Sequence, residues 1–230
     1  SFINLIITSP KKMEKLNKYF TQKQYEYRAM IDKADTTSEL LNVYQTIMDD
    51  LTSVWDITLV NDMYSFIFTA LSGKKGKERL ANIKNLESMK PVIALNELVK
   101  LYKTEGLNET YLSKEKEYIE TFGDRCLEEL KLETKTYRTT PELLRQYIEG
   151  AEVLMISTET EKGRDKYFVN KAKVGIYNRE ISRMNRTRIF GMAREIMLRI
   201  GENFVSDGYL KAREDVFYLF YEELSESKSY

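Results

Sequence analysis

The stretch that decides the fold runs from Asn178 to Leu224 and reads NREISRMNRTRIFGMAREIMLRIGENFVSDGYLKAREDVFYLFYEEL. Its first half carries apolar residues at the spacing of one helix face, at about 100° per residue. Gly201 and the Asp207-Gly208 pair then mark a break and a turn. The stretch therefore predicts one long helix whose apolar stripe consists of Ile189, Ala193, Ile196 and Ile200, widened on one side by Ile181 and Met192.

The same helix carries a second, basic stripe. A buried guanidinium without a partner is very costly, so an arginine at an apolar edge must be paired or point into a cavity. We expect Arg188 and Arg199 to be in that position, because they fall roughly opposite the basic stripe on a helical wheel. The basic stripe consists of Arg179, Arg183, Arg186 and Arg194.

Four of these arginines are candidates for binding phosphate or a carboxylate, because a guanidinium matches both groups with two parallel hydrogen bonds. The alternative is a solvated face neutralised by Glu180, Glu195 and carboxylates of neighbouring helices. The sequence leaves both interpretations open. The four candidates are Arg179, Arg183, Arg186 and Arg188.

A second candidate segment runs from Phe122 to Leu130 and reads FGDRCLEEL. Gly123 allows a sharp turn, after which Arg125 and Glu129 can pair with each other or with the arginine helix. An ion pair that holds two helices together is the structural interpretation of these two residues. We predict no catalytic residue here, because the chain has no histidine to activate Cys126.

Composition narrows the class of protein. The chain has 230 residues, 42% of them hydrophobic, and its 36 basic and 36 acidic residues cancel. A neutral total argues against a general binder of nucleic acid or anionic membranes. The single cysteine excludes an internal disulfide and suggests a reducing, cytoplasmic setting. No Gly-rich phosphate loop or metal-ligand spacing is present, so we expect no cofactor or metal in this chain.

The fold class predicted from these patterns is all-α, an irregular multi-helix bundle with one long arginine-rich helix near the C-terminus. We expect a single helical domain over 1–230, with possible sub-parts 1–112 and 113–230. The predicted helices span 9–32, 36–73 (one bent helix or two), 78–89, 91–106, 113–123 and 141–150, with a basic connector over 74–79, a mobile loop over 157–165 and a possible strand over 216–219.

Three pieces of the second half, in their order and spacing, resemble a known family. They are Phe122-Gly123-Asp124-Arg125 with Glu129-Leu130 and Tyr137-Arg138…Pro141; then Asn178-Arg179-Glu180, Arg183, Arg186-Thr187-Arg188-Ile189-Phe190-Gly191 and Arg194-Glu195-Ile196; then Arg213-Glu214-Asp215-Val216-Phe217-Tyr218-Leu219. Together they resemble the phosphoenolpyruvate-utilising enzymes, namely phosphoenolpyruvate synthase-like proteins and rifampicin phosphotransferases. The resemblance covers about the last half of the chain.

The resemblance implies a helical middle domain between an ATP-grasp domain and a phosphohistidine domain of one parent chain. Such a parent uses ATP and Mg²⁺ to phosphorylate a histidine, which passes the group to pyruvate or a small apolar acceptor. This chain lacks histidine and begins at Ser1 without an initiator methionine, so we expect an excised piece that is not catalytic alone. Asp124, Cys126 and Glu128 depart from the histidine and glycines common in the family, which suggests another substrate.

Two further interpretations belong to other classes of protein. A stand-alone helical scaffold could use the basic stripe to bind an acidic partner protein, and its reading frame would then begin near Ser1 and stop near Tyr230. Nucleic-acid binding through the arginine helix is disfavoured by the neutral total charge. The aromatic and methionine side chains of the first half are expected in the core, with an apolar acceptor pocket as the alternative; they are Phe20, Tyr25, Tyr44, Met48, Met63 and Tyr64.

Overall fold

The computed structural model describes residues 2–52, 54–81, 89–126, 128, 130–155 and 167–226. The protein is all-α, and no residue within these ranges lies in a strand. In chain order its elements are α1 (Phe2–Lys33), α2 (Thr37–Thr52), α3 (Asp56–Leu71), α4 (Gly73–Ala81), α5 (Lys90–Glu105), α6 (Glu109–Phe122), α7 (Pro141–Gly150), α8 (Tyr167–Ser206), the 3-10 helix η2 (Arg213–Tyr218) and α9 (Tyr221–Glu226).

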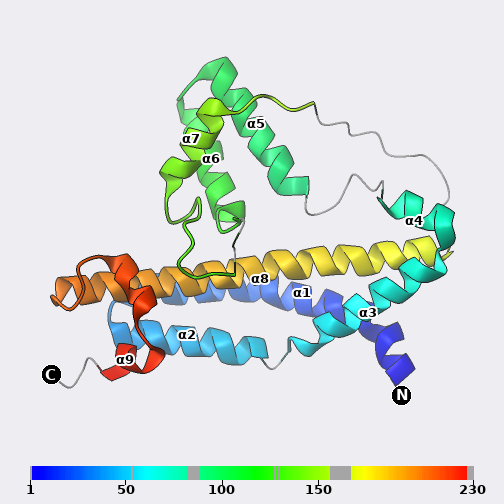
Figure 1. Cartoon of the computed structure of the whole chain (residues 1–230), viewed down its shortest axis with the longest axis horizontal. Coiled ribbons are helices and arrows are strands. Elements are labelled where there is room, and N and C mark those ends of the chain that lie inside the picture. The colour runs from blue at the N-terminus through cyan, green and yellow to red at the C-terminus, as the bar shows by residue number, and fades with distance from the viewer. Residues whose placement is uncertain are drawn as a thin grey trace.

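The long helix α8 is the axis of the molecule (Figure 1). Helix α1 runs beside it, α2 and α3 follow one another along the same side, and η2 packs on its C-terminal part. Helices α5, α6 and α7 stand together as a separate group on the other side of α8. The prediction of one long arginine-rich helix near the C-terminus is confirmed, and the helix is longer than expected because it begins at Tyr167.

The two larger hydrophobic cores correspond to these two groups, and a smaller cluster joins α4 to the start of α8. The main core joins α1, α2, α3, α8, η2 and α9, and it contains the predicted stripe residues Ile189, Ile196 and Ile200. The second core lies within α5, α6 and α7 and includes Tyr111, Tyr118 and Leu144. The sub-parts predicted over 1–112 and 113–230 are therefore not separate packing units, because residue 112 falls inside α6 and each core draws on both sides of it.

Helix α1 begins before the position that the sequence suggested. The Ser9-Pro10 pair predicted a helix start, yet Pro10 lies inside a helix that begins at Phe2. A proline has no N–H for the carbonyl four residues earlier, which here is the carbonyl of Ile6. The buried Ser9 hydroxyl donates to that carbonyl instead, at 2.8 Å. This local replacement of a backbone donor explains why the helix continues through the proline.

Most other boundaries follow the predicted signals. The Thr36 and Glu39 capping box is formed, since the Glu39 carboxylate accepts from the Thr36 N–H and the Thr36 hydroxyl accepts from the Glu39 N–H. The 36–73 pattern is two helices, α2 and α3, and helices α5 and α7 match the predicted ranges 91–106 and 141–150. Helix α6 starts four residues before the predicted 113, because the Asn108 side chain caps it by accepting from the Tyr111 N–H at 2.8 Å.

Two short predictions are wrong. The basic connector expected over 74–79 is part of helix α4, which packs Leu80 against Val169 and Ala172 of α8. The strand expected over 216–219 is instead largely part of the 3-10 helix η2. The Asp215 carboxylate accepts from the Ala212 N–H and so caps the N-terminal end of this helix. Buried Val216 then packs into the main core.

Two further predictions lie outside the described residues: the loop over 157–165, and most of the helix over 78–89, of which Glu78–Ala81 belongs to α4. Within the described part of the chain, no helix has both the length and the apolar character needed to cross a membrane.

Candidate functional site

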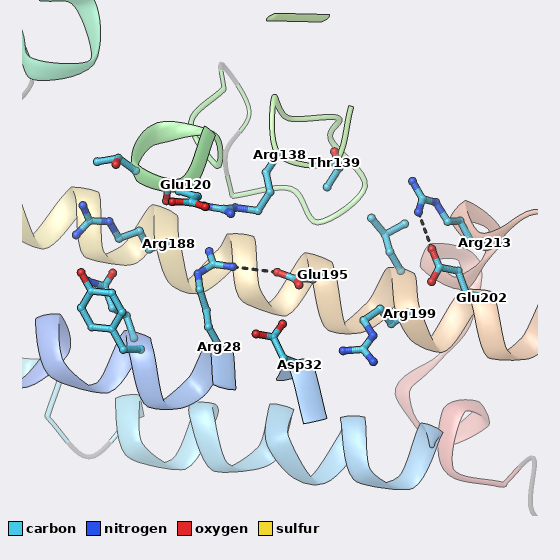
Figure 2. A pocket seen from close by; sticks show the side chains of 14 residues that line it. Arg28, Asp32, Glu120, Arg138, Thr139, Arg188, Glu195, Arg199, Glu202 and Arg213 are labelled. Atoms are coloured by element: carbon cyan, nitrogen blue, oxygen red, sulfur yellow. Dashed lines mark hydrogen bonds and ion pairs between the residues drawn. The ribbon is translucent and has the colours of Figure 1, made fainter. Parts of the chain in front are cut away.

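An arginine-rich cleft of about 670 Å³ lies where α1, α8, α6 and η2 approach one another (Figure 2). The cleft crosses the boundary between the two helix groups, so its walls belong to both. Its arginines are Arg28 of α1, Arg138 of the segment between α6 and α7, Arg188 and Arg199 of α8, and Arg213 of η2; Gln24, Tyr25, Asp32, Glu120, Thr121, Thr139, Glu195, Leu198 and Glu202 complete the lining.

A buried carboxylate beneath the cleft holds two of these arginines. Asp124 is 3% exposed, and it accepts from Arg28 Nη2 at 3.1 Å and from Arg138 Nε at 2.8 Å. Arg28 also donates to Glu195 at 3.0 Å, while Arg138 donates to the Glu120 carbonyl at 2.7 Å. The two guanidinium groups are therefore fixed by partners on α6, on α8 and on the segment that follows α6. They join the α5–α7 group to α1 and α8.

Gly191 makes this arrangement possible. A Cβ atom at Gly191 would overlap with the carboxyl group of Asp124. The missing side chain on α8 thus leaves the space in which the buried carboxylate lies against the helix backbone. We attribute the glycine at this position to that close approach rather than to backbone conformation, because Gly191 sits in the middle of α8.

Two more arginines of the cleft are bound to the protein itself. Arg199 donates to the carbonyl oxygens of Ile31 and Ala34 at the end of α1. Arg213 donates to Glu202 at 2.6 Å and to Glu214 at 3.2 Å. These bonds hold η2 and the end of α1 against α8, and they define one end of the cleft (Figure 2).

Arg188 differs from its four neighbours. Among the described residues no carboxylate lies within 4.0 Å of its guanidinium, and its hydrogen bond is a long one, 3.4 Å from Nη1 to Asn185 Oδ1. Burial lowers the pKa of the Arg188 guanidinium from its usual value; Asp124 opposes this shift, while the positive charges of Arg28 and Arg138 add to it. An arginine stays charged in a protein. The cleft thus contains one partly buried cation that lacks an ionic partner.

The other predicted site residues do not gather with Arg188. Arg179 and Arg183 are exposed on α8 and do not line the cleft. Arg186 lines a different, apolar cavity. Arg125 is half-buried beside Tyr118, whose pKa its charge lowers slightly against a larger effect of burial. Glu129 lies outside the described residues, so the predicted Arg125–Glu129 pair has no structural description.

Arg194 was placed on the basic stripe, yet it is 1% exposed. Its Nε donates to the Leu132 carbonyl at 2.9 Å and its Nη2 donates to the Lys131 carbonyl at 2.8 Å. Arg194 therefore holds the segment that follows α6 against α8 through two backbone carbonyl oxygens.

Sequence reasoning missed three arginines of the cleft as site residues, namely Arg28, Arg138 and Arg213. Arg138 and Arg213 lie in segments that carry the family resemblance, so that signal could have found them. Arg28 has no such signal. It meets Glu195 across a sequence separation of 167 residues, which local patterns do not encode.

No model of a known protein family matches this chain, and no solved structure matches it. Within the described residues, no group of three or more histidine, cysteine, aspartate or glutamate side chains is arranged to hold a metal ion.

Proposed function

We propose that this chain is the helical acceptor or linker domain of a phosphoenolpyruvate synthase-like phosphotransferase, and that its arginine-rich cleft receives a phosphoryl or carboxylate group. The observation that carries the proposal is Arg188, a partly buried guanidinium without a carboxylate partner in a cleft of about 670 Å³. The sequence resemblance suggests the family, and the Arg188 guanidinium, unpaired among the described residues, supports an anion site at this end of the cleft.

An anion bound at Arg188 would supply the ionic partner that this guanidinium lacks among the described residues. Arg28 and Arg138 are neutralised by Asp124 and Glu195, whereas Arg188 is not. A phosphate or carboxylate oxygen would form charge-assisted hydrogen bonds with this guanidinium, and a partly desolvated site strengthens such bonds. The cleft as a whole is close to neutral, so we expect the affinity for anions to be concentrated at the Arg188 end.

In this proposal the chain itself binds the phosphoryl or carboxylate group and orients it. It has no histidine, so in this proposal the phosphoryl group arrives on a histidine of a neighbouring domain of the same parent chain. The fixed arginines around Asp124 would form a rigid wall against which that domain docks. The acceptor is pyruvate or a small apolar molecule, ATP and Mg²⁺ belong to the parent's other domains, and a single cysteine fits a cytoplasmic enzyme.

Titration of the 230-residue chain with inorganic pyrophosphate, followed by calorimetry at constant ionic strength, tests the cleft. We expect Arg188→Gln to weaken binding by about tenfold, the magnitude of one lost charged hydrogen bond. Arg179→Gln is the matched control, because Arg179 is exposed on the same helix. Equal losses in the two variants, or no pyrophosphate binding by the unmodified chain, would contradict an anion site at Arg188.

The reading frame and the activity of the full-length parent enzyme test the proposed family. The reading frame should encode an ATP-grasp domain before residue 1 and a phosphohistidine domain after residue 230. In that enzyme, Arg188→Ala should reduce phosphoryl transfer more than Arg179→Ala, while ATP-dependent labelling of the isolated chain should be absent. A reading frame that covers these residues alone would instead favour the non-enzymatic scaffold.

A further inference from the structure

A second cavity, which we call the apolar pocket, lies on another face of α8 and has a volume of about 450 Å³. Helix α2, the α2–α3 junction, α8 and the segment after α6 form its walls. Its lining is mostly apolar with one charged residue, and it consists of Tyr44, Met48, Leu51, Trp55, Leu132, Arg186, Ile189, Phe190 and Ala193.

The walls of this pocket are held in place by contacts outside it. Trp55 packs edge-on against Phe20 with ring centroids 5.8 Å apart, and Tyr44 lies 5.9 Å from Tyr221. Leu132 is fixed because its carbonyl accepts from buried Arg194. A pocket of this volume with aromatic walls and few polar groups is typical of sites for small organic ligands, which are usually preformed.

Arg186 is the charged residue of the pocket. Its Nε is buried and has no hydrogen-bond acceptor, and no ion pair of Arg186 is present among the described residues. Protein carboxylates satisfy the cleft arginines Arg28 and Arg138, so their absence here is a property of this pocket. A buried donor left without an acceptor is unfavourable, and an apolar surrounding increases the effect.

We propose that the apolar pocket binds a flat aromatic molecule that carries one anionic group, such as a carboxylate, sulfonate or phenolate. The aromatic part would lie between Trp55, Tyr44 and Phe190, and the anionic oxygen would accept from the Arg186 guanidinium. Charge complementarity selects this class over a neutral apolar ligand or an apolar peptide segment. The inference does not rest on the proposed phosphotransferase function, because Arg186 and Arg188 line different cavities.

The chain provides its own reporter for the test. Trp55 is the only tryptophan of the sequence and lines the pocket, so a naphthalene probe bound there should quench its fluorescence by energy transfer. The probe is 1-anilinonaphthalene-8-sulfonate, a naphthalene with one sulfonate, and its neutral analogue is N-phenyl-1-naphthylamine. We expect saturable one-to-one binding of the sulfonate with energy transfer from Trp55, and binding of the neutral analogue that is about tenfold weaker.

Two variants separate the charge from the cavity. Arg186→Gln should weaken sulfonate binding by about tenfold and leave the neutral analogue unchanged. Arg183→Gln, at an exposed position one turn earlier on α8, should change neither. Ala193→Leu should reduce binding of both probes, because its longer side chain fills the pocket from the α8 wall. Circular dichroism of each variant is the control for folding.

Three results would overturn the proposal. One is sulfonate binding without quenching of Trp55, which would place the probe elsewhere. Another is equal binding of the sulfonate and its neutral analogue, which would leave Arg186 without a role. The third is an equal effect of the Arg186 and Arg183 substitutions, which would indicate general electrostatic attraction.

Discussion

At the scale of single residues, Gly191 and Asp124 determine how the two helix groups meet. A methyl group at Gly191 would overlap with the Asp124 carboxyl group, which is held by Arg28 and Arg138 and cannot move without breaking those bonds. We expect Gly191→Ala to lower the free energy of unfolding by about 2 kcal/mol, within the range of overpacked interiors. Urea denaturation measures the change.

The control for this prediction is Gly150→Ala. Gly150 lies in α7 with no atom near the position of an added Cβ, so alanine should be neutral or slightly stabilising. Equal effects at positions 150 and 191 would show that helix propensity, and not the contact with Asp124, decides the result.

Arg186 offers a second residue-scale prediction, which concerns stability rather than binding. Its Nε is buried without an acceptor, so Arg186→Met should raise the free energy of unfolding by about 1 kcal/mol. For a chain of this length the melting temperature should then rise by about 2 to 4 °C. Exposed Arg183→Met is the control and should leave the melting temperature nearly unchanged. A lower melting temperature for Arg186→Met would mean that its guanidinium is favourably bound.

The sequence could identify some of these residues and not others. The helical wheel singled out Arg188 and Arg199 as arginines that need a partner or a cavity, and both line the cleft. It could not separate Arg186 and Arg194 from the exposed Arg179 and Arg183, since the burial of the first pair depends on Leu132 and the segment around it. That segment follows α6, and Leu132 lies 62 residues before Arg194 in the chain. Local sequence patterns do not encode a contact over such a separation.

At the scale of elements, Ser9 keeps α1 continuous through Pro10. Ser9→Ala would leave the Ile6 carbonyl without a donor in a buried position, because Pro10 has no N–H. We expect the free energy of unfolding to fall by about 1 to 2 kcal/mol, and amide exchange to increase in the first turns of α1. Thr8→Ala is the control, since the Asn4 carbonyl keeps its backbone donor when the Thr8 hydroxyl is removed. Equal amide protection in Ser9→Ala and the unmodified chain would contradict this role.

Local signals predicted elements well where a side chain and the backbone interact within a few residues. The Thr36–Glu39 box and the boundaries at Pro91, Pro141 and Gly150 are of that kind. The signals failed where a distant contact decided the outcome. Residues 74–79 are helical because Leu80 packs on α8, and the Val216 turn forms against the main core. The all-α class was therefore accessible from the sequence, whereas the two-core arrangement was not.

At the scale of the whole molecule, both hydrophobic cores contain buried tyrosines. Tyr27 of the main core is 1% exposed, and burial together with the Asp50 carboxylate raises its pKa. Burial raises the pKa of Tyr111 and of Tyr118 to about 12, and the Glu115 carboxylate adds to the effect at Tyr111. An unfolded tyrosine titrates near pH 10. A raised pKa means that the folded state holds its proton more tightly, so this stability is fully present below about pH 10 and is lost as pH rises toward about 12.

We therefore expect the melting temperature to fall as pH rises from about 10 to about 12, because the tyrosines of both cores lose their proton more readily in the unfolded chain. Tyr118→Phe removes one ionisable group, so it should flatten this decline by an amount on the order of 2 kcal/mol in unfolding free energy. Tyr25→Phe is the control, because Tyr25 is 70% exposed. Identical pH profiles for Tyr118→Phe and Tyr25→Phe would indicate that ionisation of Tyr118 does not limit alkaline stability.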